Sequence, residues 1–383
     1  MANIKIKTGG KSTLVGTFIP VGSRNEPDEI KGISHLLEHM MFKGTKTLDK
    51  NELKKSLDKY GAGFNAWTSK EHTFYYATIS SKYANEARKV IDDMVSNSIF
   101  PAEELEKEKQ VVLQELEMYE DNPKSHIFAV SQEAIFKTGS GLHIPIIGTR
   151  ETVNNIDRKT LVKYYEDNYK LKFQLDVGNI PRDADNRIYF DAGFCQEKID
   201  YDKEELIVKR KGVNQANMVV TGCSHLNGME EYYKMELLSA IMNGFSGRFF
   251  DVIREKHNLV YHTGFYHQVY SCGTIQYWGY AGLKPEKVTL ADGLIREQLI
   301  TPITEEELNF ARTKWLGQYE LELDSKSELA KIAIDSTLAG TDYKKHMKKY
   351  KYYMDKITVS DINSFVSKFN FENSKLVAIV PEK

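Results

Sequence analysis

The spacing of hydrophobic positions along this chain predicts an alternation of strands and helices. Short apolar or alternating runs predict strands over about 12–21, 64–68 and 73–80. Apolar residues spaced three and four apart predict helices over about 83–97 and 101–119. Because neighbouring strands occur in pairs between the helices, we predict an α+β fold in which mainly antiparallel sheets are packed with helices.

The second half of the chain repeats the order of elements in the first half. Residues 79–120 and 281–323 each run from a strand through a helix to a proline, an acidic first turn and a long helix, at an offset of about 202 residues. A chain of 383 residues is also longer than one ordinary hydrophobic core. We therefore predict two duplicated domains, residues 1–195 and 196–383.

One predicted helix, over about 30–42, carries an unusual polar set. His35, Glu38 and His39 stand in the order H-x-x-E-H, and residues three and four apart share one face of a helix. Burying these side chains without partners would cost several kcal/mol, whereas a divalent cation would satisfy them. In the second half the aligned positions lack this set, so we expect one metal site per chain. Those positions are Glu236, Ser239 and Ala240.

A catalytic zinc site needs a third protein ligand. The long helix after Pro101 offers Glu108 and Glu115, which are seven residues apart and so lie on one face. The residues alone do not choose between these two carboxylates. Mn²⁺ or Co²⁺ could occupy the same kind of ligand set as Zn²⁺.

Composition and charge exclude several other classes of protein. The net charge is −2 and neither half is basic, so we expect no binding to nucleic acid. No run reaches 18 apolar residues, and the first residues do not resemble a signal peptide, so we expect no membrane association. The three cysteines, Cys195, Cys223 and Cys272, lack metal-type spacing, which predicts a reduced, cytoplasmic setting.

The H-x-x-E-H stretch followed by Glu115 resembles the pitrilysin/insulinase family of zinc metallopeptidases, which includes the mitochondrial processing peptidases. Three further stretches are similar to family motifs. They are Asn65-Ala66-Trp67-Thr68-Ser69, His143-Ile144-Pro145 with Gly148-Thr149, and Arg254-Glu255-Lys256 with Tyr261. Two departures from the family pattern are expected: a leading strand missing at the N-terminus, and a helix missing within residues 173–195.

The resemblance implies a role for each residue of the metal helix and its neighbours. One Zn²⁺ per chain would be held by His35, His39 and Glu115. Glu38 would act as the general base, and Glu108 would support the ligands from a position two turns before Glu115.

The resemblance also implies how a substrate would be held. The edge strand formed by Asn65, Ala66, Trp67 and Thr68 would pair with an extended peptide. Arg254 and Tyr261 would contact the substrate carbonyl near the metal. In the family this pair reaches the zinc from the opposing half of a chamber, so we expect a homodimer in which each chain completes the other's site.

The expected function is therefore that of a zinc metalloendopeptidase acting on short or unfolded peptides inside a chamber. Two alternatives stay open. The chain could be a subunit that processes one specific precursor and needs a different partner chain, or it could be a non-catalytic subunit that only binds peptides.

Overall fold

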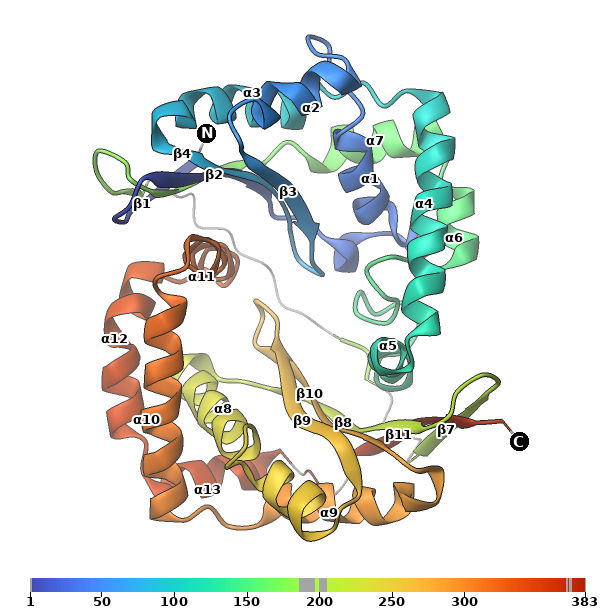
Figure 1. The fold of residues 1–383 in the computed structure, drawn as a ribbon, viewed down its shortest axis with the longest axis vertical. Helices are drawn as coiled ribbons and strands as arrows, with labels where there is room; N and C mark the ends of the chain where they lie inside the picture. The colour runs from blue at the N-terminus through green and yellow to red at the C-terminus, as the bar shows by residue number, and fades with distance from the viewer. Residues whose placement is uncertain (1, 186–196, 200–204, 370, 372–373, 383) are drawn as a thin grey trace. The chain divides into compact units, whose positions relative to one another are not determined.

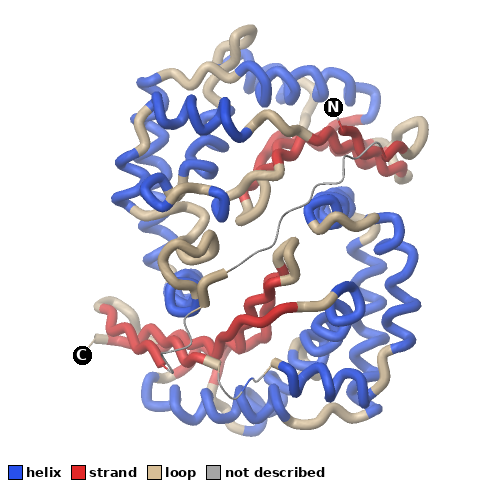
Figure 2. Tube along the Cα trace, turned by 180° about the vertical axis from the view of Figure 1, so that it is seen from behind, coloured by secondary structure: helices blue, strands red, loops and turns tan. Residues whose placement is uncertain are grey.

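The computed structural model describes residues 2–185, 197–199, 205–369, 371 and 374–382. The chain divides into two compact units, each of which contains one β-sheet packed with helices (Figures 1 and 2). The α+β class predicted from the sequence is confirmed. The first unit comprises Met1–Met118, Ile144–Ala192 and Glu322–Tyr343, and the second comprises Tyr119–His143, Gly193–Leu321 and Lys344–Lys383.

The sheet of the first unit has the strand order β3-β4-β2-β5-β1-β6. Its described strands pair antiparallel except for β1 with β5, which run parallel. The strands are β1 (Ala2–Lys7), β2 (Ser12–Ile19), β3 (Gly63–Thr68), β4 (Thr73–Ser80), β5 (Phe173–Gly178) and β6 (Ala184–Asp185).

The expectation that a leading strand is missing is wrong, because β1 fills that place. Ile4 and Ile6 alternate with lysines, and both isoleucines are buried, as expected for a strand with one face on the core. The second departure concerns residues 173–195. Residues 186–195 of that segment lie outside the described part of the chain.

Helices cover the first sheet and carry the polar residues discussed below. The 3₁₀ helices are η1 (Ser23–Asn25), η2 (Asp28–Ile30) and η3 (Ser81–Tyr83). The α-helices are α1 (Ile33–Met41), α2 (Lys50–Asp58), α3 (Ala84–Asn97), α4 (Ala102–Asp121), α6 (Arg150–Asn155), α7 (Arg158–Asn168) and α11 (Lys326–Leu338).

The sheet of the second unit has the strand order β7-β11-β8-β10-β9, which matches, read from the other end, the order of the first sheet without β6. Its strands are β7 (Glu205–Arg210), β8 (Ala216–His225), β9 (Val260–Val269), β10 (Thr274–Leu283) and β11 (Lys375–Pro381). Its helices are α5 (Pro123–Ile135), α8 (Gly228–Met242), the π-helix η4 (Phe250–Lys256), η5 (Pro285–Lys287), α9 (Val288–Ile300), α10 (Glu305–Glu322), α12 (Tyr343–Lys356) and α13 (Val359–Lys368). The matching strand order is the structural counterpart of the internal repeat.

Each unit contains a helix that follows a helix of the other unit along the chain. Helix α5 follows α4 along the chain but packs on the second sheet, where Trp278 Nε1 donates to Ser131 Oγ at 2.7 Å and Lys375 Nζ donates to the carbonyl of Ala134 at 3.1 Å. Helix α11 follows α10 but contacts β2 and β5 of the first sheet. The units are therefore built from interleaved segments, and not from two consecutive halves of the chain.

The cysteines do not share one state. Cys223 is a free, half-buried thiol, whereas Cys272 is disulfide-bonded, so the expectation of three reduced cysteines is wrong for Cys272. The spacing of cysteines along the chain does not predict which of them form disulfides in the folded protein. Cys195 lies outside the described residues. Among the helices that the structure describes, none combines the length and apolar character needed to cross a membrane.

The helix exchange predicts which unit a mutation in α11 will weaken. Ile334 is fully buried on α11, so Ile334→Ala should cost about 2–5 kcal/mol through the cavity it leaves. Hydrogen exchange should then accelerate in β2 and β5. Ile295→Ala on α9, which packs on the second sheet, is the matched control and should accelerate exchange in β8 instead. Faster exchange in β8 caused by Ile334→Ala would contradict the exchanged packing of α11.

Candidate metal and catalytic site

Helix α1 presents His35, Glu38 and His39 from one face, and its other side chains anchor it in the core. Leu36, Leu37, Met40 and Met41 are fully buried in the main cluster of the first unit. The pattern that made this helix conspicuous in the sequence therefore has a simple structural basis. The apolar residues hold the helix, and the three polar residues share the face that remains.

The N-terminus of α1 is held by a buried carboxylate. Glu26 accepts hydrogen bonds from the backbone N–H groups of Gly32 at 2.8 Å and Ser34 at 2.7 Å, which would otherwise lack helical partners. Gly32 has a φ of +95°, and a Cβ there would lie 2.5 Å from the carbonyl oxygen of Ile147. Only glycine fits this entry to the helix.

Glu26 is only 4 % exposed, and a second buried charge lies beside it. The Nζ of Lys31 donates to the backbone carbonyl of Glu26 at 2.7 Å and lies 3.7 Å from Asp28. Burial raises the pKa of Glu26 to about 7, although its two backbone hydrogen bonds and Lys31 act in the opposite direction. No sequence pattern points to this pair, because neither residue belongs to a metal or catalytic motif.

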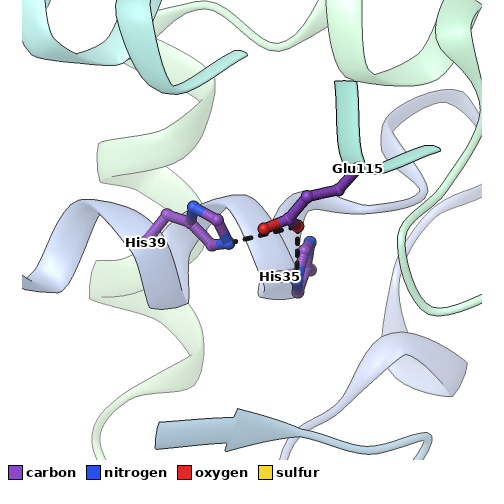
Figure 3. A group of neighbouring side chains, drawn as sticks. All are labelled: His35, His39 and Glu115. Carbon is purple, nitrogen blue, oxygen red and sulfur yellow. Dashed lines mark ion pairs between the residues drawn. The ribbon is translucent and has the colours of Figure 1, made fainter. Parts of the chain in front are cut away.

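Helix α4 brings Glu115 to the two histidines (Figure 3). Glu115 Oε2 lies 3.7 Å from His35 Nε2 and 3.6 Å from His39 Nε2. One ligand atom from each of these residues lies within 4.8 Å of the other two, and no other metal-type group occurs among the described residues. Ligands at about 2.0–2.2 Å from a tetrahedral zinc lie about 3.3 Å apart. The two carboxylate–imidazole distances need only a small contraction to reach that spacing, while the group as a whole, which spans up to 4.8 Å, has to draw closer around the ion.

The chemistry of the donor set also fits a cation. Burial lowers the pKa of His35 to about 4, with His39 contributing, so the imidazole is neutral and offers a lone pair at neutral pH. His35 Nδ1 is buried and has no hydrogen-bond partner among the described groups. The other ring nitrogen, Nε2, faces Glu115 and can offer its lone pair to a cation.

Glu108 occupies a different place from Glu115. Its Oε2 lies 3.1 Å from His39 Nδ1, and its other oxygen accepts from Lys43 Nζ. Glu108 is only 8 % exposed, so Lys43 supplies the opposite charge that a buried carboxylate requires. The geometry thus separates the two carboxylates that the sequence left open: Glu115 faces the histidine Nε2 atoms, and Glu108 orients His39 from behind.

Glu38 lies on the same face of α1 but outside the three-residue group. Thr68, at the end of β3, donates from Oγ1 to Glu38 Oε2 at 2.5 Å. Burial raises the pKa of Glu38, partly offset by the Thr68 hydrogen bond. A carboxylate with a raised pKa beside a metal site suits proton transfer.

The predicted substrate strand is β3, which forms an edge of the first sheet. Asn65 is exposed, whereas Ala66 and Trp67 are half-buried. The Trp67 indole N–H donates to His72 Nε2 at 3.0 Å, and its ring packs on Phe74. The backbone edge of β3 is therefore accessible to pairing, while the Trp67 side chain is occupied within the protein.

Arg254 and Tyr261 belong to the second unit, whereas the histidines belong to the first. Arg254 lies in the π-helix η4, with its guanidinium 4.7 Å from the centroid of the Phe250 ring. The backbone of Tyr261 lies in β9, and its side chain is outside the described part of the structure.

In the second unit, side chains occupy the position that corresponds to the metal site. Glu236 on α8 accepts from Trp315 Nε1 at 2.9 Å and lies 3.2 Å from His267 Nε2. Trp315 lies on α10, the counterpart of α4. The carboxylate is satisfied by side chains of its own unit, so this unit has no need of an ion there.

Two family models of known proteins match parts of this chain. Residues 4–150 match the family "Insulinase (Peptidase family M16)", and residues 191–314 match "Peptidase M16 inactive domain". The chain therefore belongs to the insulinase family of peptidases, M16.

A bacterial relative supports this assignment over nearly the whole chain, and a solved structure shares the fold. An "uncharacterized zinc protease", YmxG of Bacillus subtilis, is 31% identical, covering 97% of this chain and 93% of the relative. The human mitochondrial-processing peptidase subunit beta is 36% identical over 43% of this chain and 33% of its own length. The fold is similar to that of a protease from Helicobacter pylori, with a TM-score of 0.87, 20% identity and coverage of 99% and 97% of the two chains.

The buried Glu26 predicts how stability depends on pH. Its pKa is raised from 4.5 to about 7 in the folded protein, so the native state binds this proton more tightly and loses stability as the pH rises through that window. Glu26→Gln removes the titration. From pH 5 to pH 8 the variant should therefore gain about 3 kcal/mol relative to the wild type.

The measurement is the difference in free energy of unfolding between the two proteins, with a chelator present so that metal binding does not contribute. Glu29→Gln removes an exposed carboxyl group three residues away and is the control. A constant difference between the wild type and Glu26→Gln across this pH range would show that Glu26 is ionised in the folded protein throughout.

Proposed function

We propose that this chain is a zinc-dependent metalloendopeptidase that cleaves short or unfolded peptides. The observation that carries the proposal is the meeting of His35, His39 and Glu115 with Glu38 on the same helix face. The set supplies three ligands for one zinc ion per chain and a carboxylate outside the ligand group, which is the combination that metal-assisted peptide hydrolysis requires.

In the proposed mechanism the protein's own residues bind and move protons. The zinc ion, when bound, supplies Lewis-acid chemistry. Glu38 accepts a proton from the attacking water and returns it to the leaving amide nitrogen. Glu108 keeps His39 oriented through its 3.1 Å contact, and Lys43 holds Glu108 in that position.

The edge strand β3 supports the proposed substrate class. An extended peptide can add to β3 by backbone hydrogen bonds, which need no particular side chain on the substrate. A folded protein keeps its backbone groups paired internally and cannot pair in this way. Short or unfolded peptides are therefore the proposed substrates.

The decisive experiment combines metal content with cleavage of a mixed peptide library by the purified chain. Glu38→Gln should lower kcat by about 10²–10⁴-fold and leave zinc bound, because it removes the base and no ligand. His39→Ala should lose both zinc and cleavage. Cleavage by Glu38→Gln at the wild-type rate would remove Glu38 from the mechanism, and peptide binding that survives chelation without any cleavage would favour the non-catalytic alternative.

We also propose a homodimer in which Arg254 and Tyr261 of one chain serve the zinc site of the other. The family resemblance of these two residues supports this arrangement, since the zinc-binding set and the Arg/Tyr pair occur in the same chain. A specific processing peptidase with a different partner chain is the alternative, and it requires that the purified chain alone cleave poorly.

Mixing two inactive variants tests the homodimer. Glu38→Gln lacks the base, and the double variant Arg254→Ala/Tyr261→Phe lacks the substrate contacts. If the sites are completed between chains, dissociating and mixing equal amounts should restore about a quarter of the wild-type activity, because half the dimers then contain one intact site. No recovery, or full activity in a sedimenting monomer, would exclude this arrangement.

A further inference from the structure

We propose that Thr68 is a positioning residue, whose hydroxyl orients the base Glu38. This role is separate from any part that the β3 backbone plays in holding the substrate. The inference rests on the proposed function, in which Glu38 transfers the proton. It assigns to the side chain of Thr68 a task that differs from the substrate-binding role expected from the sequence.

The contact between the two residues joins two elements far apart in the chain. Thr68 Oγ1 donates to Glu38 Oε2 at 2.5 Å, the short distance typical of a hydroxyl bonded to a carboxylate. Helix α1 and strand β3 also contact each other, and Phe42, directly after α1, packs on Phe64 of β3 with the ring centroids 5.0 Å apart. Thr68 thus fixes one oxygen of Glu38 and leaves Oε1 for the water that must be deprotonated.

The turn that follows Thr68 is held by a directional hydrogen-bond network. Trp67 Nε1 donates to His72 Nε2, so His72 carries its proton on Nδ1 and donates it to Ser69 Oγ at 2.9 Å. His72 is 5 % exposed, and burial, with Lys331 contributing, lowers its pKa to about 3, which keeps the ring neutral.

Backbone bonds complete this support. Ser69 N–H donates to the carbonyl of His72 at 2.8 Å, and the carbonyl of Ser69 accepts from the N–H of Ser23 at 3.1 Å. Thr68 therefore precedes a turn whose backbone is held on both sides. A hydroxyl on such a support can hold the Glu38 carboxylate in one orientation, which is what proton transfer at a defined water requires.

The position of Thr68 also links the base to the substrate strand. Thr68 is a residue of β3, and β3 is the edge that would pair with an extended peptide. A peptide docked along β3 would order the same backbone that carries the hydroxyl. The base and the substrate would then be placed by one strand, with no further element between them.

The test compares Thr68→Val, which keeps the β-branched shape and removes the donor, with Thr68→Ser, which keeps the donor. Thr68→Val should lower kcat by about 10–100-fold while KM and zinc content stay within about twofold of the wild type. Thr68→Ser should recover most of kcat. The control is Thr78→Val on β4, an exposed threonine opposite Gly63, which should leave kcat unchanged.

A purely structural role for Thr68 would lower the thermal midpoint and zinc content of both Thr68 variants and would not be rescued by serine. Wild-type kcat in Thr68→Val, or a change confined to KM, would overturn the inference. If Thr68→Val does not fold, Thr68→Ala against Thr68→Ser gives the same comparison. Glu38→Gln separates the two proposals: if that variant is inactive and Thr68→Val is fully active, only the role of Thr68 fails.

Discussion

The convergence of two imidazole nitrogens and one carboxylate oxygen is the constraint on which the first unit depends. Three electron-pair donors within 4.8 Å of one another repel or lack partners unless a cation binds between them. The fold accepts this arrangement because other interactions hold helix α1 and His39 in place. Glu26 anchors the start of α1, Glu108 holds the far side of His39, and the buried leucines and methionines keep the helix in the core.

The second unit shows what the same topology does without this constraint. Its strands follow the same order, yet the corresponding carboxylate, Glu236, is hydrogen-bonded to Trp315 and paired with His267. Both carboxylate oxygens of Glu236 have partners from the same unit, so this carboxylate is satisfied without an ion. The two units therefore share one scaffold. Among the described residues, the side-chain contacts of Glu236 distinguish this position from the metal-type group of the first unit.

Much of the fold followed from local patterns. Strands β2, β3 and β4, the long helix after Pro101 and the repeat were predictable because hydrophobic periodicity is set by residues close in sequence. Strand β1 was missed because a six-residue run with only two buried isoleucines is a weak signal. The exchange of α5 and α11 left no trace in the sequence, since either helix can bury its apolar face against either sheet.

By itself the sequence determined that His35, Glu38 and His39 share one helix face, because helical geometry relates residues three and four apart without reference to the rest of the chain. It could not choose between Glu108 and Glu115, which lie on the same face of α4 and differ only in their height along it. The way in which α4 packs beside α1 decides which carboxylate faces the histidine Nε2 atoms, and that residue is Glu115. Only tertiary structure also brought Thr68 and Lys43 to carboxylates 30 and 65 residues away, because such contacts depend on the packing of whole elements.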